Sequence, residues 1–389
     1  MQVRRCAAIS LELRETARFE LEDLLAGGAG VVARQRWLAH APHLPAAIEL
    51  DADEAVLLGS LSPTAWTDAT ALAERFGSLV DNLLERGLLV VDAEPWAPHR
   101  IADEAFRTQY WHPLAAQWHM ASRWSGVDGP AEVAAAGVDT SQGLRSRHGP
   151  PPAALLSRVP AEARVGLPRI PATGFDDLLD RRSTCRNFDP AAVLSLDALS
   201  QMLSRVFGMR GCVHAAADFD VIKRTSPSGG ALHPTECYLI VQRVQTLAPG
   251  LYHYHLGDHA LEPLPTPTGL ELSALARSAV AGQHYFADAP VLCVLAPRFA
   301  RSFWKYRNHP KAYRVAILDV GHMSQTLQLC ATEQGWGAFV TAAINEIEIE
   351  RAFGLCGHAE GPLAVCGFGP RAAAMSTSEL DPNGRVWPR

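Results

Sequence analysis

The stretch RRSTCRNF, residues 181–188, places three arginines within six positions just before a helical pattern. Guanidinium groups form bidentate, charge-assisted hydrogen bonds with phosphate, and the hydroxyls of Ser183 and Thr184 stand between them. The alternative interpretation is a basic turn whose charges only face water. The segment therefore predicts either a phosphate clamp or an exposed turn, and the segments that follow must decide.

A second segment, KRTSPSGGALHP at residues 223–234, leads into an apolar strand pattern. Its paired glycines let the backbone approach a flat ring, and Ser226 and Ser228 can meet the polar edge of that ring. The spacing matches neither the G-x-G-x-x-G dinucleotide turn nor the P-loop. A simple turn is the alternative.

A third segment, FWKYR at residues 303–307, follows a strand pattern and precedes a long helical one. Lys305 beside Tyr306 offers two proton-transfer groups, and the pKa of each can be lowered by a neighbouring cation. Arg307 and Arg314 are the candidates for that cation. An ordinary surface lysine is the alternative.

Around these segments, helical and strand patterns alternate from residue 174 to the end. Ser195 predicts the N-cap of a helix that runs to about residue 207. The other patterns predict strands at 236–244, 250–255, 260–264, 291–296, 336–343 and 363–367, and helices at 311–333 and 346–353. With so few regular β-α-β units, we expect an α+β fold with a mixed, mostly antiparallel sheet flanked by helices.

The N-terminal part has a different order of predicted elements. Residues 49–92 predict a helix, a turn, a second helix and a strand, which is the order found in a winged helix. The second helix, residues 71–86, carries more acidic than basic side chains, which argues against a DNA-recognition helix. We expect a winged-helix-like domain at 1–105, a helical and proline-rich connector at 106–173, and the α+β domain at 174–389. The first domain either binds a peptide by strand addition or is purely structural.

The composition of this 389-residue chain excludes several classes of function and location. The formal net charge is −6, so a general affinity for nucleic acid or anionic membrane is not expected. The eight cysteines stand singly, without metal-ligand spacing, and we expect buried thiols and no metal site. Neither a secretion signal nor a membrane-spanning run is expected. A cytoplasmic location follows from these expectations.

Taken in this order, the three segments resemble those of the nitroreductase-like flavoproteins, and specifically the SagB-type peptide dehydrogenases, over about residues 175–371. The motif R-x-[ST]-x-R-x-F is met by Arg182, Thr184, Arg186 and Phe188. The resemblance implies a nitroreductase-like FMN fold in which Arg182, Thr184 and Arg186 hold the FMN phosphate. Ser183 would lie beside the ribityl tail.

The later motifs extend this resemblance. The segment SPSGGALHP is similar to the family's flavin-edge segment, which implies FMN contacts for Ser226, Pro227, Ser228 and Gly229. The stretch from residue 335 to 343 is similar to the region that passes the flavin ring, which implies contacts for Thr341 and Ala342. The sequence departs from the family pattern at Asn345-Glu346, so the amide that faces the flavin N5 is left open. Arg371 would add to the phosphate clamp.

The pair Lys305-Tyr306 is similar to the Lys-Tyr motif of azoline-oxidising members. The resemblance implies that the protein oxidises thiazolines or oxazolines to azoles in a ribosomally made precursor peptide, with one of this pair as the base. It also implies a homodimer with FMN at the interface and a cyclodehydratase partner. The alternatives are a flavin-dependent reductase of dehydroamino acids in a lanthipeptide and a non-catalytic scaffold that recruits the peptide. A plain nitro- or quinone-reductase would lack the Lys-Tyr pair.

Overall fold

The computed structural model describes residues 1–94 and 97–387. The chain forms two compact units. The N-terminal unit consists of Met1–Arg123 with Phe299–Arg314, and the sheet unit consists of Trp124–Arg298 with Val315–Arg389. Each unit is described by itself below. No helix among the described residues combines the length and the apolar character needed to cross a membrane.

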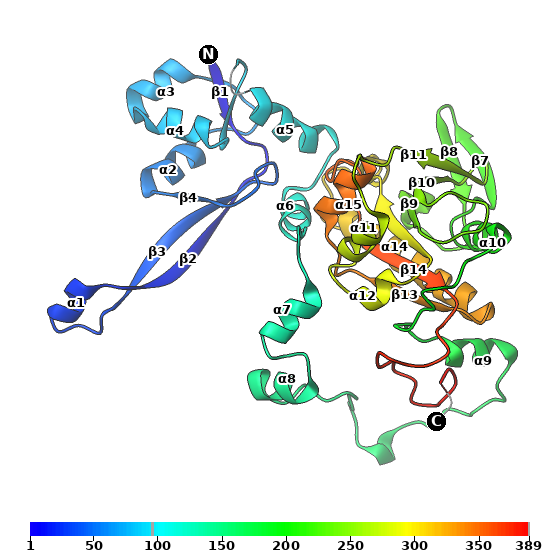
Figure 1. Ribbon diagram of the computed structural model, residues 1–389. Helices are drawn as coiled ribbons and strands as arrows, with labels where there is room; N and C mark the ends of the chain where they lie inside the picture. Colours follow the sequence, from blue (N-terminus) through cyan, green and yellow to red (C-terminus); the bar gives the residue numbers. More distant parts are fainter. Residues whose placement is uncertain (95–96, 388–389) are drawn as a thin grey trace. The chain divides into compact units, whose positions relative to one another are not determined.

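The sheet unit is built on six strands in the order β11-β10-β9-β12-β14-β13 (Figure 1). All five neighbouring pairs are antiparallel, and parallel pairing is confined to isolated bridges such as Thr184 with Ala338. The strands are β9 (Thr235–Val241), β10 (Gly250–His255), β11 (Ala260–Leu264), β12 (Val291–Pro297), β13 (Gly337–Thr341) and β14 (Ala364–Gly369). The predicted strands are therefore confirmed to within about three residues at their ends.

Helices cover both faces of this sheet because side chains alternate along each central strand. Cys237, Leu239 and Val241 of β9 face a core that includes residues of α10 (Leu196–Val206) and α14 (Ala312–Glu333). Tyr238 and Ile240 face the opposite core, with α11 (Leu272–Ala279), α12 (His284–Ala287) and α15 (Glu346–Phe353). The predicted α+β class is confirmed, and Ser195 caps α10 by accepting from the N–H of Ala198 at 3.1 Å.

Further elements of the sheet unit had no clear sequence signal. A hairpin of β7 (Gly211–Ala216) and β8 (Phe219–Lys223) precedes the serine-glycine segment. Every residue of β7 is exposed, so the apolar alternation that reveals a half-buried strand is missing. The helices α7 (Gly129–Ala135) and α8 (Ser141–His148) lead into an exposed stretch, residues 150–173, which has no helix or strand apart from one 3₁₀ turn at Ala161–Ala163. Prolines in this stretch disfavour a longer helix.

In the N-terminal unit, β1 (Gln2–Arg5) pairs with β5 (Thr67–Asp68) on one side and β6 (Leu89–Val91) on the other. Helix α2 (Ala52–Ser60) begins at a capping box formed by Asp51 and Glu54. The single helix predicted at 71–86 was wrong, because Gly77 adopts φ 58° and separates α3 (Ala69–Phe76) from α4 (Leu79–Glu85).

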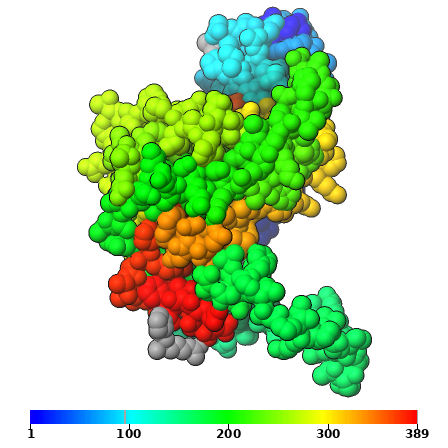
Figure 2. Space-filling view, turned by 90° about the vertical axis from the view of Figure 1, so that its right-hand side faces the viewer, coloured from blue at the N-terminus to red at the C-terminus, as the bar shows by residue number. Residues whose placement is uncertain are grey.

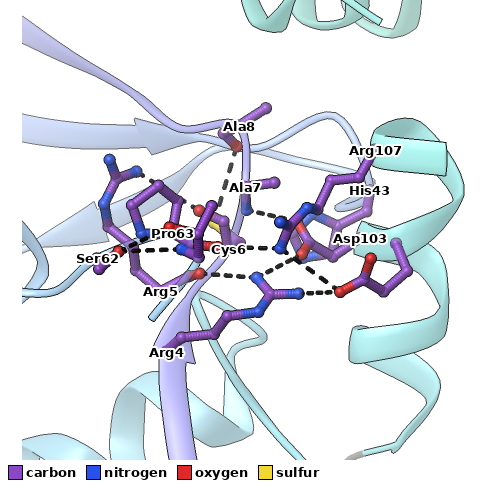
Figure 3. A network of polar contacts seen from close by, with 12 residues as sticks. Arg4, Arg5, Cys6, Ala7, Ala8, His43, Ser62, Pro63, Asp103 and Arg107 are labelled. Atoms are coloured by element: carbon purple, nitrogen blue, oxygen red, sulfur yellow. Dashed lines mark hydrogen bonds and ion pairs between the residues drawn. The ribbon is translucent and has the colours of Figure 1, made fainter. Parts of the chain in front are cut away.

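The N-terminal unit also carries features that the sequence did not predict. Two strands of ten residues each, β2 (Ser10–Phe19) and β3 (Val31–His40), form a hairpin with the short helix α1 (Leu21–Leu25) at its tip. Strand β4 (Ile48–Leu50) pairs with β3. Helices α5 (Ala97–Thr108), α6 (Pro113–Ala121) and α13 (Phe299–Phe303) also belong to this unit. Figure 3 shows the buried Arg4 of β1 paired with Asp103 of α5 at 2.8 Å. This buried ion pair ties the first strand to the fifth helix.

Candidate functional site

Residues 181–188 follow α9 (Gly174–Arg181) as an extended segment, held to β13 by a hydrogen bond from the Cys185 N–H to the Ala338 carbonyl at 2.9 Å. Side chains of an extended chain alternate between two sides. Arg182, Thr184 and Arg186 are partly exposed. Ser183, Cys185 and Asn187 are buried. The three residues predicted to hold a phosphate therefore share one face, which we call the arginine face.

Two side chains of the arginine face have partners. The Arg182 guanidinium donates to Gln328 Oε1 on α14 at 3.0 Å. The Arg186 guanidinium donates to the Ser378 carbonyl at 3.2 Å and stands 5.9 Å from the centre of the Tyr285 ring. Partial exposure leaves the other nitrogens of both groups accessible to a ligand.

Ser183 and Arg371 meet on the opposite, buried side of this segment. Arg371 donates to the Ser183 hydroxyl at 3.0 Å and to the Glu379 carboxylate at 2.6 Å. Burial alone would raise the pKa of Glu379, but hydrogen bonds from Trp387, the Arg186 N–H and Asn187 outweigh burial and keep the pKa below its ordinary value. Ser183 and Arg371 are thus bonded to each other and, through Arg371, to Glu379. Their cofactor contacts, which the family resemblance implies, stay predictions.

The serine-glycine segment is anchored on α14. Ser226 bonds with the Thr326 hydroxyl at 2.8 Å, while Ser228 and the Gly229 N–H both donate to the buried carboxylate of Asp319. A Cβ at Gly229 would come within 2.1 Å of Val315 Cγ1. Close packing on this helix therefore already requires glycine at position 229, independently of any approach to a flat ring. Gly230 has φ 65°, a conformation that favours glycine.

A cavity of about 650 Å³ lies between the β7–β8 hairpin and the serine-glycine segment. Its lining combines apolar side chains of the hairpin, such as Val213 and Ile222, with the predicted FMN contacts Ser226, Pro227 and Ser228. Arg224 also lines the cavity, is 4% exposed, and has no hydrogen-bond partner for Nε or Nη2 among the described residues. Burial lowers the pKa of Arg224. Buried donors without a partner are rare and call for an explanation, such as a ligand.

Within one chain, the arginine face and the serine-glycine segment contact α14 at different residues. Arg182 reaches α14 at Gln328, whereas Ser226 reaches it at Thr326. Two residues correspond to a rotation of about 200° around an α-helix. The two segments therefore contact roughly opposite sides of α14.

Thr341 and Ala342 lie at the end of β13. The Thr341 hydroxyl accepts from Gln283 Nε2 and from the Ala343 N–H, each at 3.1 Å, so this hydroxyl closes a local turn. Ala342 is exposed. The buried Asn345 donates to the carbonyls of Val127 and Ser278, which makes it a structural residue of this corner.

Lys305 and Tyr306 belong to the N-terminal unit, whereas the other predicted site residues belong to the sheet unit. Lys305 is exposed, and its Nζ lies 5.6 Å from the centre of the Tyr306 ring. The loop is fixed within its own unit, because Arg307 lies 4.3 Å over the Tyr110 ring and the Asn308 N–H donates to the Tyr110 carbonyl at 2.9 Å. A catalytic role for the pair stays a prediction.

Cys6, His43 and Asp103 form a cluster that the sequence did not reveal, because the three residues are far apart in the chain. Their possible ligand atoms lie within 4.8 Å of one another (Figure 3). Both Asp103 oxygens are already engaged, one by Arg4 and one by the Ala7 N–H. Burial, reinforced by Asp103, raises the pKa of Cys6 to about 12. With the Arg4 cation bound to the same carboxylate, we interpret the cluster as structural.

Sequence reasoning also missed three residues of the candidate site. Asp319 holds the serine-glycine segment, Glu379 holds the segment that carries the arginine face, and Arg224 lines the cavity. A lone acidic residue within the otherwise apolar positions of a long helix was the available signal for Asp319. Glu379 stands in a polar C-terminal stretch that has no periodicity, so no pattern marked it.

Comparison with known proteins identifies the domain. The nitroreductase family matches residues 179–370. The chain is 29% identical over 189 residues to MJ1384 of Methanocaldococcus jannaschii, named as a nitroreductase, covering 48% of this chain and 86% of that protein. It is 28% identical over 191 residues to the microcin B17-processing protein McbC of Escherichia coli, covering 47% and 65%.

The chain is also 28% identical over 158 residues to the trifolitoxin-processing protein TfxB of Rhizobium leguminosarum bv. trifolii, covering 40% of this chain and 42% of that protein. Both matches to peptide-processing proteins thus span less than two thirds of the relative's length. Among solved structures, a chain of the E. coli microcin synthetase McbBCD complex with truncated pro-MccB17 bound aligns at 22% identity, over 69% of this chain and 97% of that chain, with TM-score 0.48. Residues 179–370 of this chain are therefore a nitroreductase-family domain.

Proposed function

We propose that this protein is an FMN-dependent dehydrogenase that oxidises azolines to azoles in a ribosomally made peptide, as a SagB-type enzyme. The observation that carries the proposal is the shared exposed face of Arg182, Thr184 and Arg186, the three residues assigned to the FMN phosphate. The peptide-processing relatives support a peptide as the substrate.

The residues present fit FMN at both of its ends. The arginine face supplies two guanidinium groups and a hydroxyl, which suits a phosphate monoester. The cavity supplies apolar walls, hydroxyls and the unpartnered nitrogens of Arg224, which suits a flat ring with a polar edge. The chemistry that bound FMN supplies is the acceptance of a hydride.

A second copy of the chain would complete this site. The arginine face and the serine-glycine segment approach opposite sides of α14, which favours a site in which one FMN takes the arginine face from one chain and the serine-glycine segment from another. Helix α14 also presents an exposed stripe of Ile317, Leu318 and Gly321. Apolar residues at this helical spacing suit burial against another protein surface. We therefore include a homodimer with FMN at its interface in the proposal.

Lys305 and Tyr306 would perform the proton chemistry. One of them removes a proton from the azoline ring as base, and the other orients the ring or stabilises negative charge. Both lie on an accessible loop, which suits a substrate as large as a peptide. Which of the two is the base is left open by the geometry.

Peptide binding would fall to the N-terminal unit. Strand β2 ends the order β2-β3-β4, so its outer edge has no partner strand among the described residues. An extended peptide can add to such an edge through main-chain hydrogen bonds. A cyclodehydratase partner, which would make the azoline, and a cytoplasmic location complete the proposal.

The test uses the purified full chain, FMN and a peptide that contains a thiazoline. Conversion of the thiazoline to the thiazole should lower the mass of the peptide by two hydrogens, which mass spectrometry measures. The reaction should need no nicotinamide donor. Lys305→Ala should retain FMN but lose at least about 10²-fold in rate, the usual share of a general base, whereas the nearby Lys311→Ala should not.

Three results would count against the proposal. Unchanged turnover in Lys305→Ala would remove the assigned role of that residue. A requirement for a nicotinamide donor, with reduction of a dehydroamino acid, would favour the reductase alternative. A protein that takes up no FMN would favour a peptide-recruiting scaffold.

A further inference from the structure

Glu379 lies buried behind the arginine face. Its side chain has no exposed area, and its carboxylate accepts four hydrogen bonds. The donors are the Arg186 N–H at 2.5 Å, Asn187 Nδ2 at 2.8 Å, Arg371 Nη1 at 2.6 Å and Trp387 Nε1 at 2.8 Å. Figure 2 shows the C-terminal residues, in red, packed against the sheet unit.

These bonds hold the extended segment at successive positions. Arg371 reaches Ser183 with its second terminal nitrogen, while Glu379 itself binds Arg186 and Asn187. Side chains of an extended segment alternate, so fixing the backbone and the rear side chains of residues 183–187 also fixes the direction of the front ones. The geometry of the arginine face therefore depends on a carboxylate that does not belong to it.

We infer that Glu379 is a positioning residue for the arginine face and that Arg371 is its buried counter-charge, not a contact of the cofactor phosphate. This inference rests on the proposed function, because it concerns the same phosphate site. It assigns Arg371 a different role from the one that the family resemblance implies. The two terminal nitrogens of Arg371 are already committed to Glu379 and Ser183.

The physical consequence is that substitutions of Arg371 and Glu379 should not have additive effects on FMN binding. A residue that acts only through a second residue has no further effect once that second residue is gone. If Arg371 held the phosphate directly, adding Arg371→Met to Glu379→Leu would remove a further contact and weaken FMN binding again.

The experiment compares dissociation constants for FMN and for riboflavin, which has the same ring but no phosphate, by quenching of flavin fluorescence. Glu379→Gln places an amide N–H group against the side-chain and backbone donors that now bond to the carboxylate, which disturbs the arginine face. FMN affinity should therefore fall about tenfold or more, the usual scale for a charged hydrogen bond. Riboflavin affinity should change by less than about twofold, since the ring lies elsewhere. Glu271→Gln, an exposed residue of the same unit, is the control.

The decisive comparison is between Glu379→Leu and the pair Arg371→Met with Glu379→Leu. Both should bind FMN about tenfold or more weakly than the wild type, because the donors of Arg186, Asn187 and Trp387 lose their acceptor. The pair should lie within about twofold of Glu379→Leu, because Arg371 acts on the arginine face only through Glu379. Glu379→Asp, which keeps the charge, should lie between wild type and Glu379→Gln, and circular dichroism checks that each variant is folded.

Two results would overturn the inference alone. One is an FMN affinity in Glu379→Gln that equals or exceeds that of the wild type. The other is a double variant that binds FMN at least about tenfold more weakly than Glu379→Leu alone. If the wild type bound neither flavin, the proposed function would fail and this role with it.

Discussion

Asp319 and Ser228 form the contact on which the serine-glycine segment rests, with the Ser228 hydroxyl donating to the Asp319 carboxylate at 2.5 Å. The same carboxylate accepts from the Gly229 N–H at 3.2 Å, and the Ser228 oxygen accepts from the His233 N–H at 2.9 Å. One buried carboxylate thereby fixes the turn that precedes β9.

Replacing Asp319 by Ala should loosen this turn. The variant leaves the Ser228 hydroxyl and the Gly229 N–H without their acceptor, at a cost of about 1–3 kcal/mol in unfolding free energy. Hydrogen exchange at Gly229 should accelerate, while exchange within β12 should change only with global stability. Unchanged exchange at Gly229 would mean that the turn holds itself.

Burial raises the pKa of Asp319, and this predicts a pH dependence. The folded state then binds more protons than the unfolded state between the ordinary value of 3.8 and the raised pKa. The contribution of Asp319 to stability therefore falls as the pH rises through that window. The stability of the wild type relative to Asp319→Asn should decline over this range in urea unfolding, and a flat difference would contradict the shift.

Gly229→Ala should destabilise the sheet unit by packing alone. The added Cβ would meet Val315 Cγ1 at 2.1 Å, an overlap that typically costs about 1–3 kcal/mol. Val315→Ala removes the opposing methyl group. In the Val315→Ala background, Gly229→Ala should therefore cost much less unfolding free energy than it does in the wild type. Failure of this rescue in a double-mutant cycle would show that the backbone, not Val315, rejects a side chain.

Arg224→Met should separate folding from flavin binding. Methionine removes two buried donors that have no partner among the described residues, together with the Nη1 hydrogen bond to the Thr235 carbonyl at 2.8 Å. The flavin-free protein should therefore lose about 1–3 kcal/mol of stability, the usual cost of leaving a buried acceptor without its donor. Flavin affinity should fall about tenfold or more for FMN and riboflavin alike. The exposed Arg277→Met is the control. Large destabilisation without flavin would instead make Arg224 structural.

His253 should make the sheet unit less stable at high pH. A hydrogen bond to Glu236 raises the pKa of His253 against the opposing effect of burial, and Glu262 adds to the rise. A raised histidine pKa gives stability that is complete below the ordinary value of 6.5 and is lost as the pH rises through the folded-state pKa. His253→Gln should lack this loss in unfolding experiments across that range. Parallel pH profiles for both proteins would refute the assignment.

Local sequence signals were enough to predict most of the strands and helices of the sheet unit. Ser195 was identified as a cap because its hydroxyl needs only the N–H three residues later. The strands β10 and β11 match their predicted bounds, because alternating runs between turn residues are local signals. The arginine face also follows from alternation along residues 182–186 once that segment is extended.

Tertiary structure decided what each side chain can reach. The family resemblance places Arg371 in the phosphate clamp, but in the fold its guanidinium donates to the buried carboxylate of Glu379. Gly229 could serve a ligand or a helix, and only the position of Val315 shows that a helix already requires it. Sequence patterns carry periodicity and local capping, whereas the partner of a buried charge is set by chain segments that meet only after folding.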